Sequence, residues 1–180
     1  MQQKIVLIGG PGTGKSSVLN ELKKRGYTCM PEISRDITLQ AQKEGIDQLF
    51  LKNPLLFSEL VLKGRIKQYK DAEKTTANLI FFDRGIPDTY AYMDFLKTDY
   101  PSVFKEKSSQ FIYNKIFRLA PWKMIYTSDN ERYETFEQMV KIDAFLKKSY
   151  LEIGYKINDV PFGTVDDRCD YILHSLNHKV

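Results

Sequence analysis

One short stretch constrains the fold of this chain more than any other. Residues 9–16 read Gly-Gly-Pro-Gly-Thr-Gly-Lys-Ser, the spacing of a glycine, four residues, a second glycine, a lysine and a hydroxyl residue. The apolar run at residues 4–8 predicts a buried strand before this stretch, and apolar side chains at helical spacing predict a helix over residues 15–25 after it. The chain is therefore expected to turn sharply from a strand into a helix through a loop that needs glycine.

A glycine-rich turn between a strand and a helix is typical of a loop that binds phosphate, and we call residues 9–16 the phosphate loop. Glycines allow positive φ, so successive N–H groups face an anion, and the helix beginning at Lys15 adds its positive N-terminal dipole. The Lys15 ammonium suits the β- and γ-phosphates of ATP, and the Ser16 hydroxyl suits Mg²⁺. The alternative is a glycine turn with no ligand. The residues expected to contact the nucleotide are Gly9, Gly10, Pro11, Gly12, Thr13, Gly14, Lys15, Ser16 and Ser17.

Apolar runs suited to parallel strands alternate with helical patterns along the rest of the chain. Further strands are expected at residues 27–30, 79–82, 115–119 and 155–160, with residues 123–127 as a rival for the fourth. Further helices are expected at residues 33–45, 54–76, 87–96, 101–114, 133–150 and 165–176. This alternation predicts an α/β fold of three layers, in which right-handed crossovers place helices on both faces of a five-stranded parallel sheet.

In such a sheet, ligands bind beyond the carboxyl ends of the strands. Gly9, Glu32, Asp83 and Pro161 all fall at the ends of predicted strands. We therefore expect four separate segments of the chain to converge on one crevice.

Length and composition predict one domain spanning residues 1–180, because a second core would be hard to fit. The 27 Lys and Arg against 23 Asp and Glu give a net charge of +4, and both signs are dispersed along the chain. Nucleic-acid-binding proteins usually gather basic residues on one face, so no nucleic-acid partner is expected. No apolar run suits a signal peptide or a membrane span, which predicts a cytoplasmic protein with no membrane partner.

Asp83 directly follows four apolar strand residues. Phosphate-loop proteins usually place there the acid that holds Mg²⁺ through water, so Ser16 and Asp83 are the expected metal residues. The alternative for Asp83 is a helix cap ahead of the Ile86-Pro87 pair.

Glu32 follows the second predicted strand, where a carboxylate opposite the γ-phosphate can accept a proton from a substrate hydroxyl or hold a metal-bound water. Its alternative role is to stabilise the first turn of the helix that begins at Ile33. Arg35, one turn further on, is a candidate for binding an anionic or hydroxylated acceptor, and a solvated helix arginine is equally compatible with the pattern.

The polar stretch at residues 122–132 lies between the fourth strand and a long helix, in the position of a mobile lid. Arg132 is the candidate within it for a catalytic guanidinium, since a cation that closes on the transferred phosphoryl group stabilises its charge. The alternative is an arginine that pairs with Asp129 or Glu134 at the start of the helix.

The pair Asn114-Lys115 superficially suggests a guanine-reading motif, but Phe117 stands where that motif needs an aspartate. A GTPase of the Ras type is therefore disfavoured.

The chain resembles the small AAA-type ATPase domain family, which is related to the ribosylnicotinamide kinase domain of the bacterial NAD regulator, and more broadly the P-loop kinases of nucleosides and nucleotides. The resemblance is carried by residues 9–17, Pro31-Glu32 with Arg35, Phe82-Asp83-Arg84-Gly85, Ala120-Pro121-Trp122, Asp129 with Arg132, and Val160-Pro161 with Arg168. It implies a sheet order of 2-3-1-4-5, a lid that carries Arg132, and an adenine site near residues 161–164. It names no acceptor.

These residues predict a phosphotransferase that depends on ATP and Mg²⁺ and acts on a small metabolite such as a nucleoside or nucleotide. Lys15 and Arg132 are expected to neutralise the phosphoryl charge, Ser16 and Asp83 to hold the metal, and Glu32 to orient or deprotonate the acceptor. The helices after Glu32 are expected to form the acceptor side. The alternative is an ATPase or nucleotide-gated binding protein, which the long helical segment at residues 54–76 keeps open.

Overall fold

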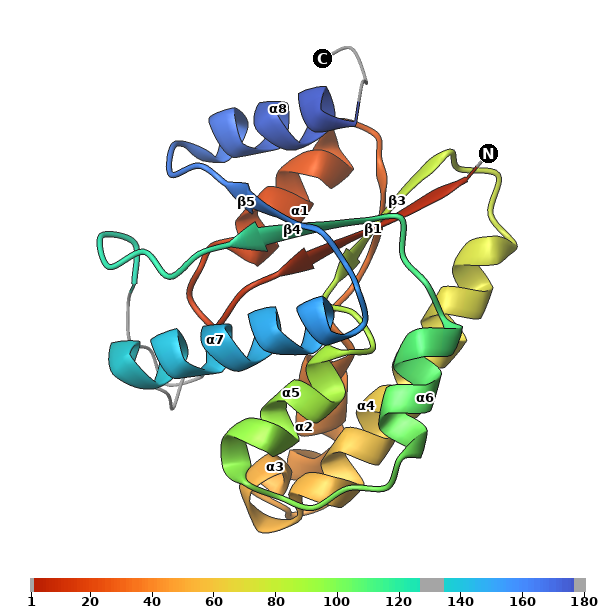
Figure 1. Cartoon of the computed structure of the whole chain (residues 1–180), viewed down its shortest axis with the longest axis vertical. Helices are drawn as coiled ribbons and strands as arrows, with labels where there is room; N and C mark the ends of the chain where they lie inside the picture. The colour runs from red at the N-terminus through yellow and green to blue at the C-terminus, as the bar shows by residue number, and fades with distance from the viewer. Residues whose placement is uncertain (1, 127–134, 177–180) are drawn as a thin grey trace.

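The computed structural model describes residues 2–126 and 135–176, and within them a five-stranded, all-parallel sheet forms the centre (Figure 1). The strand order is β2-β3-β1-β4-β5, which confirms the order that the resemblance implied. The strands are β1 (Gln3–Ile8), β2 (Thr28–Met30), β3 (Leu79–Asp83), β4 (Lys115–Leu119) and β5 (Ile157–Val160). The fourth strand lies at the first of the two predicted places, and residues 123–125 of its rival form a turn.

Helices cover both faces of this sheet, which confirms the three-layer α/β prediction. The helices are α1 (Lys15–Lys24), α2 (Ile33–Lys43), α3 (Leu49–Lys52), α4 (Pro54–Glu73), α5 (Asp88–Leu96), α6 (Val103–Gln110), α7 (Phe136–Glu152) and α8 (Val165–Ser175). In Figure 1, α1 and α8 lie on one side of the sheet and the remaining helices on the other.

Two helical details differ from the sequence prediction. The four-residue helix α3 was not predicted, and α6 ends at Gln110 although the helical pattern extended to residue 114. The reason for the early end is aromatic packing, because the rings of Phe111 and Tyr113 both lie edge-on to Tyr69, with centroids 5.2 and 5.4 Å away. Side chains two residues apart share one face only in extended backbone, so this core contact excludes a helix there.

Strand β1 shows how the sequence builds two cores at once. Ile5 and Leu7 pack with residues of α1 and α8, whereas Val6 and Ile8 pack with the aromatic residues of α4, α5 and α7. All four side chains are fully buried. Successive side chains of a strand point to opposite faces, so a continuous apolar run is what a strand covered on both sides requires.

The parallel pairing brings the strand ends together at one edge of the sheet. Leu7 pairs with Asp83, and Met30 pairs with Phe82, so the residues that follow β1, β2 and β3 emerge side by side. A Cβ on Gly9 would lie 2.4 Å from the carbonyl oxygen of Leu119, which places the end of β4 against the phosphate loop. The predicted convergence of Gly9, Glu32 and Asp83 is therefore present in the fold, and the pairing of Leu119 with Val160 brings Pro161 to the same edge.

Among residues 2–126 and 135–176, no helix combines the length and the apolar character needed to cross a lipid bilayer.

Candidate active site

The phosphate loop has the backbone that its glycines predicted. Gly9, Gly12 and Gly14 have φ values of 148°, 76° and 85°, a range that other residues rarely adopt. Space is equally restrictive, because a Cβ on Gly10 would lie 2.6 Å from Cγ of Met139 and one on Gly14 would lie 2.8 Å from Nη1 of Arg168. The loop is therefore a tight turn that leads into α1, where a side chain at these positions would strain the backbone or displace its neighbours.

Lys15 lies across this loop. Its side chain is only 6% exposed, and its Nζ donates to the carbonyl oxygens of Gly9 at 2.9 Å and Gly10 at 3.1 Å. Burial, and then the positive charge of Arg84, lower the pKa of Lys15 to about 8. The ammonium therefore still carries its charge at neutral pH, held in place by two carbonyl groups that an incoming anion can replace as partner.

The first turn of α1 is open to a ligand. Ser16 and Ser17 are exposed, and the N-cap residue is Gly14, which has no side chain to bind the N–H groups of the first turn. The hydroxyl of Thr13 is instead directed inward, where it donates to the carbonyl of Gly10 at 3.0 Å. This turn thus presents two hydroxyl groups and the positive end of a helix at the carboxyl edge of the sheet.

Asp83 is the last residue of β3 and is 5% exposed. Burial raises the pKa of its carboxyl, and the charge of Lys15 acts in the opposite direction. Within residues 2–126 and 135–176, Oδ1 of Asp83 and Nε of Arg65 are the buried side-chain polar atoms that have no hydrogen-bond partner. A buried carboxylate oxygen without a partner costs free energy, and a cation bound to it would remove that cost.

Glu32 and Arg84 form an ion pair beside Asp83. Nε of Arg84 donates to Oε1 of Glu32 at 2.9 Å, and the hydroxyl of Ser34 donates to the same oxygen at 2.8 Å. Arg84 adopts a φ of 69°, which is unusual for a residue with a side chain and marks local backbone strain. The strained turn directs a buried guanidinium from the end of β3 towards the end of β2.

The Glu32 carboxylate is ionised throughout the physiological pH range. Burial raises its pKa, but the charges of Arg84 and Lys15, together with the hydrogen bonds from Ser34 and Arg84, outweigh burial and lower the pKa to about 2. A carboxylate this acidic is a weak base and a good hydrogen-bond acceptor, so the geometry suits it to orient a hydroxyl group.

The structure brings together most of the predicted site residues and adds others. The phosphate loop, Lys15, Glu32 and Asp83 are close enough that the charges of Glu32 and Asp83 both shift the pKa of Lys15. Arg35 lies exposed on α2. Arg132 falls outside the described residues, so its predicted role stays a prediction.

Two residues of this site carried no functional signal of their own in the sequence. Asp88, at the start of α5, accepts from Nη1 of Arg84 at 3.3 Å, and Arg65, on α4, donates to the carbonyl oxygen of Gly85. Both side chains are buried, and Arg65 reaches Gly85 across 20 residues of sequence, so the fold and not the local pattern shows that contact.

An aromatic pair lies on the other side of the phosphate loop. The rings of Trp122 and Phe162 stack with centroids 4.9 Å apart, and the Arg168 guanidinium lies 5.8 Å from the Trp122 ring. Nη1 of Arg168 also donates to the carbonyl oxygen of Thr13 at 3.1 Å. This arginine therefore connects the phosphate loop to a flat aromatic surface, of which Phe162 is 57% exposed.

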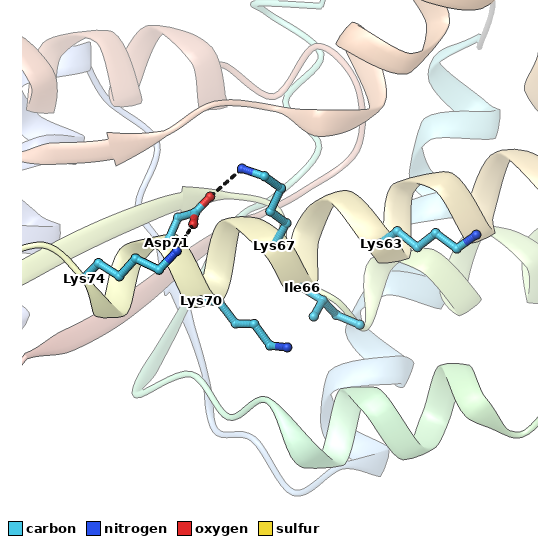
Figure 2. A pocket seen from close by; sticks show the side chains of 6 residues that line it. All are labelled: Lys63, Ile66, Lys67, Lys70, Asp71 and Lys74. Atoms are coloured by element: carbon cyan, nitrogen blue, oxygen red, sulfur yellow. Dashed lines mark hydrogen bonds and ion pairs between the residues drawn. The ribbon is translucent and has the colours of Figure 1, made fainter.

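A surface hollow lies elsewhere, along the outer face of α4 (Figure 2). Figure 2 shows that its side chains extend from α4 and from Lys74, which caps that helix, and that Asp71 pairs with Lys67 and Lys74, at 2.6 and 2.8 Å. Its lining residues are Lys63, Ile66, Lys67, Lys70, Asp71 and Lys74, none of which comes from the phosphate loop or from a strand end. This hollow is therefore separate from the phosphate loop. We place the candidate active site at the carboxyl edge of the sheet, where the phosphate loop lies.

Comparison with solved structures supports a P-loop kinase-like fold. The deoxyadenosine kinase from M. mycoides with products dCMP and dCDP bound matches with a TM-score of 0.70 and 18% identity over 97% of this chain and 99% of that one. The thymidylate kinase from Ehrlichia chaffeensis matches with a TM-score of 0.61 and 15% identity over 97% and 98%. At these identities the likeness establishes the fold alone.

The NadR protein in complex with NR matches with a TM-score of 0.76 and 13% identity over 99% of this chain. The match covers 52% of that protein, so this chain spans about half of its length. No curated protein matches the chain.

A family model gives the remaining evidence. The model described as an AAA domain matches residues 4–168, which is most of the 180-residue chain and includes the phosphate loop, Glu32, Asp83 and Arg168. The chain therefore belongs to this AAA domain family of P-loop proteins.

Proposed function

We propose that this protein is a phosphotransferase that depends on ATP and Mg²⁺ and acts on a hydroxyl group of a small metabolite such as a nucleoside or nucleotide. One observation carries the proposal. The ionised Glu32 carboxylate, held by Arg84, lies close enough to Lys15 that each of the two charges shifts the pKa of the other group. A phosphate-binding cation beside an acidic hydrogen-bond acceptor is what transfer between a nucleotide and a hydroxyl requires.

The phosphate loop and Lys15 bind the triphosphate in this proposal. The Lys15 ammonium leaves the carbonyls of Gly9 and Gly10 and donates to phosphate oxygens, and the amides of residues 9–17 surround the remainder. Arg132 adds a second positive charge at the transferred group. Lys15 and Arg132 together neutralise the negative charge on the phosphoryl oxygens while the phosphoryl group moves from ATP to the acceptor.

Ser16 and Asp83 are the residues that would hold Mg²⁺. The donor set fits a hard cation, because it combines an exposed hydroxyl with a buried carboxylate whose Oδ1 has no partner among the described residues. When bound, the ion supplies positive charge to the β- and γ-phosphates.

Glu32 orients the acceptor. Its pKa of about 2 makes it an acceptor of a hydrogen bond from a substrate hydroxyl, so that the hydroxyl oxygen faces the phosphoryl group. Similarity to the deoxyadenosine kinase and the thymidylate kinase, which share this fold, supports the proposal that the acceptor is a nucleoside or a nucleotide.

The proposal is tested by measuring ATP turnover with and without a panel of nucleosides, nucleoside monophosphates and sugars. We expect one class of acceptor to raise the turnover at least tenfold and to yield a phosphorylated product detectable by mass spectrometry. Slow hydrolysis that no acceptor stimulates would instead favour an ATPase or nucleotide-gated binding protein. The long helical segment that kept this alternative open is α4. It packs Leu62, Tyr69 and Ala72 into the core, so its length has a structural explanation.

Trp122 provides a direct report of nucleotide binding, because it is the only tryptophan in the chain and stacks on Phe162 beside the phosphate loop. We propose this aromatic pair as the surface for the adenine ring, in agreement with the implied adenine site at residues 161–164. ATP with Mg²⁺ is expected to change the tryptophan fluorescence by more than about 10%, with saturation, because a stacked base alters the environment of the indole. Inorganic triphosphate, which lacks the base, is the control and is expected to leave the emission nearly unchanged. An equal change in fluorescence with both ligands would show that the adenine ring does not stack on Trp122.

A further inference from the structure

A buried carboxylate joins three groups behind the Glu32–Arg84 pair. Oδ2 of Asp88 accepts from the backbone N–H of Gly85 at 3.1 Å and from the Tyr150 hydroxyl at 2.6 Å, while Oδ1 accepts from Nη1 of Arg84 at 3.3 Å. Asp88 is 1% exposed and Tyr150 is fully buried. Asp88 therefore has no access to a ligand and acts only on the groups around it.

Arg84 is bound at two positions of its guanidinium, which fixes its orientation. Nε donates to Glu32 at 2.9 Å, and Nη1 donates to Asp88 at 3.3 Å. The backbone after it is fixed as well, because Arg65 donates to the carbonyl oxygen of Gly85 and a Cβ on Gly85 would lie 2.4 Å from the Tyr150 hydroxyl. Both the strained backbone at Arg84 and its side chain thus depend on contacts from other elements.

Tyr150 connects this arrangement to α7. The α5 and α7 helices lie side by side (Figure 1), and the Tyr150 hydroxyl of α7 reaches Asp88 at the first turn of α5. Burial, and then the Asp88 carboxylate, raise the pKa of Tyr150 well above its usual range, so its hydroxyl remains a donor. Near the opposite end of α7, Met139 is the side chain that a Cβ on Gly10 would meet. One helix therefore contacts both the phosphate loop and the residues behind Glu32.

We propose that Asp88 and Tyr150 are positioning residues that hold Arg84, and through it the Glu32 carboxylate, in the orientation that receives the acceptor. This inference rests on the proposed phosphotransfer and deepens it, because the orientation of the acceptor then depends on two residues that contact neither ATP nor the acceptor. Without the Tyr150 hydroxyl, the Asp88 carboxylate has one hydrogen-bond donor fewer and is free to rotate towards Arg84. The rotated carboxylate then draws the Arg84 guanidinium away from Glu32.

The test replaces single hydroxyl groups. Tyr150→Phe keeps the ring and removes the bond to Asp88. Tyr90→Phe is the matched control, since Tyr90 is also buried between α5 and α7 and its hydroxyl also makes one bond of 2.6 Å, but to the backbone carbonyl of Ser149. Asp88→Asn is the second variant, because it keeps the shape of the side chain and removes its charge.

For each variant, kcat, the KM for the acceptor and the Kd for ATP with Mg²⁺ are measured together with the thermal midpoint. We expect Tyr150→Phe to lower kcat/KM for the acceptor about tenfold and Asp88→Asn to lower it more, with the Kd for ATP within about twofold of the wild type. Tyr90→Phe is expected to lower the thermal midpoint similarly and to leave both kinetic constants within about twofold.

The outcomes separate the two proposals. A Tyr150→Phe variant with the same kinetics as Tyr90→Phe would overturn the positioning role while leaving the phosphotransfer intact, as would a variant whose affinity for ATP falls as much as its use of the acceptor. A wild-type protein that phosphorylates no acceptor would overturn the proposed function first, and the positioning role with it.

Discussion

Replacement of Lys15 by alanine is expected to lower the rate of phosphoryl transfer by roughly 10²–10³-fold and to weaken ATP binding at least tenfold. The reason is geometric, because the Lys15 ammonium donates to two carbonyl groups of the phosphate loop itself, those of Gly9 and Gly10. Its pKa of about 8 keeps it charged at neutral pH. Initial rates and calorimetric titration with ATP and Mg²⁺ measure the two effects.

The control for this variant is Lys63→Ala. It removes the same charge from an exposed position on α4 that lies in the hollow of Figure 2, away from the phosphate loop. The rate and the affinity for ATP are expected to stay within about twofold of the wild type. A Lys15→Ala protein that transfers phosphate as fast as Lys63→Ala would show that the loop is not where the triphosphate binds.

Replacement of Asp83 by asparagine is expected to lower transfer by roughly 10²-fold or more and at the same time to raise the thermal midpoint at pH 7. Burial raises the pKa of this carboxyl in the folded protein, so its ionised form weakens folding. The penalty is fully present above the folded pKa and disappears below the unfolded value of about 4, where both states are protonated. The stability gain of the variant is therefore expected at pH 7 and not at pH 3.

Asp143→Asn is the matched control for a buried aspartate. Asp143 is 3% exposed, and both of its oxygens accept from Arg118, so its loss breaks a satisfied ion pair. This variant is expected to lose about 1–3 kcal/mol of stability and to retain its transfer rate. Asp83→Asn and Asp143→Asn should thus move stability in opposite directions. A less stable Asp83→Asn protein with normal activity would contradict the assignment of Asp83 to the metal.

The sequence predicted the fold well because its signals were local and strong. The buried run before Gly9, the glycine spacing and the alternation of strands and helices each depend on neighbouring residues, and all are present in the structure. The predicted helical stretch at residues 101–114 was too long, because Phe111 and Tyr113 contact Tyr69 across more than 40 residues of sequence. Such a contact can override local helical propensity and is invisible in the pattern itself.

The candidate site was predictable only in part, and for a similar reason. Glu32 and Asp83 lie at strand ends, and Lys15 follows β1 through the phosphate loop, so parallel topology alone implies that the three converge. Asp88 and Tyr150 are 62 residues apart, and Arg168 reaches Thr13 from 155 residues away. Their roles follow from the packing of α5, α7 and α8 on the sheet. The sequence shows which faces of these helices are apolar, but it does not show which polar side chains meet when the helices pack.

Calorimetric titration of the folded protein with ATP, with and without Mg²⁺, tests the central claim most directly. The claim is that the phosphate loop with Lys15 at its mouth holds a nucleoside triphosphate together with the metal. One site per chain is predicted, with binding in the presence of Mg²⁺ that is at least tenfold tighter than in EDTA and at least tenfold weaker in Lys15→Ala. Folded protein that takes up neither ATP nor GTP with Mg²⁺, or a Lys15→Ala variant that binds as the wild type does, would contradict it.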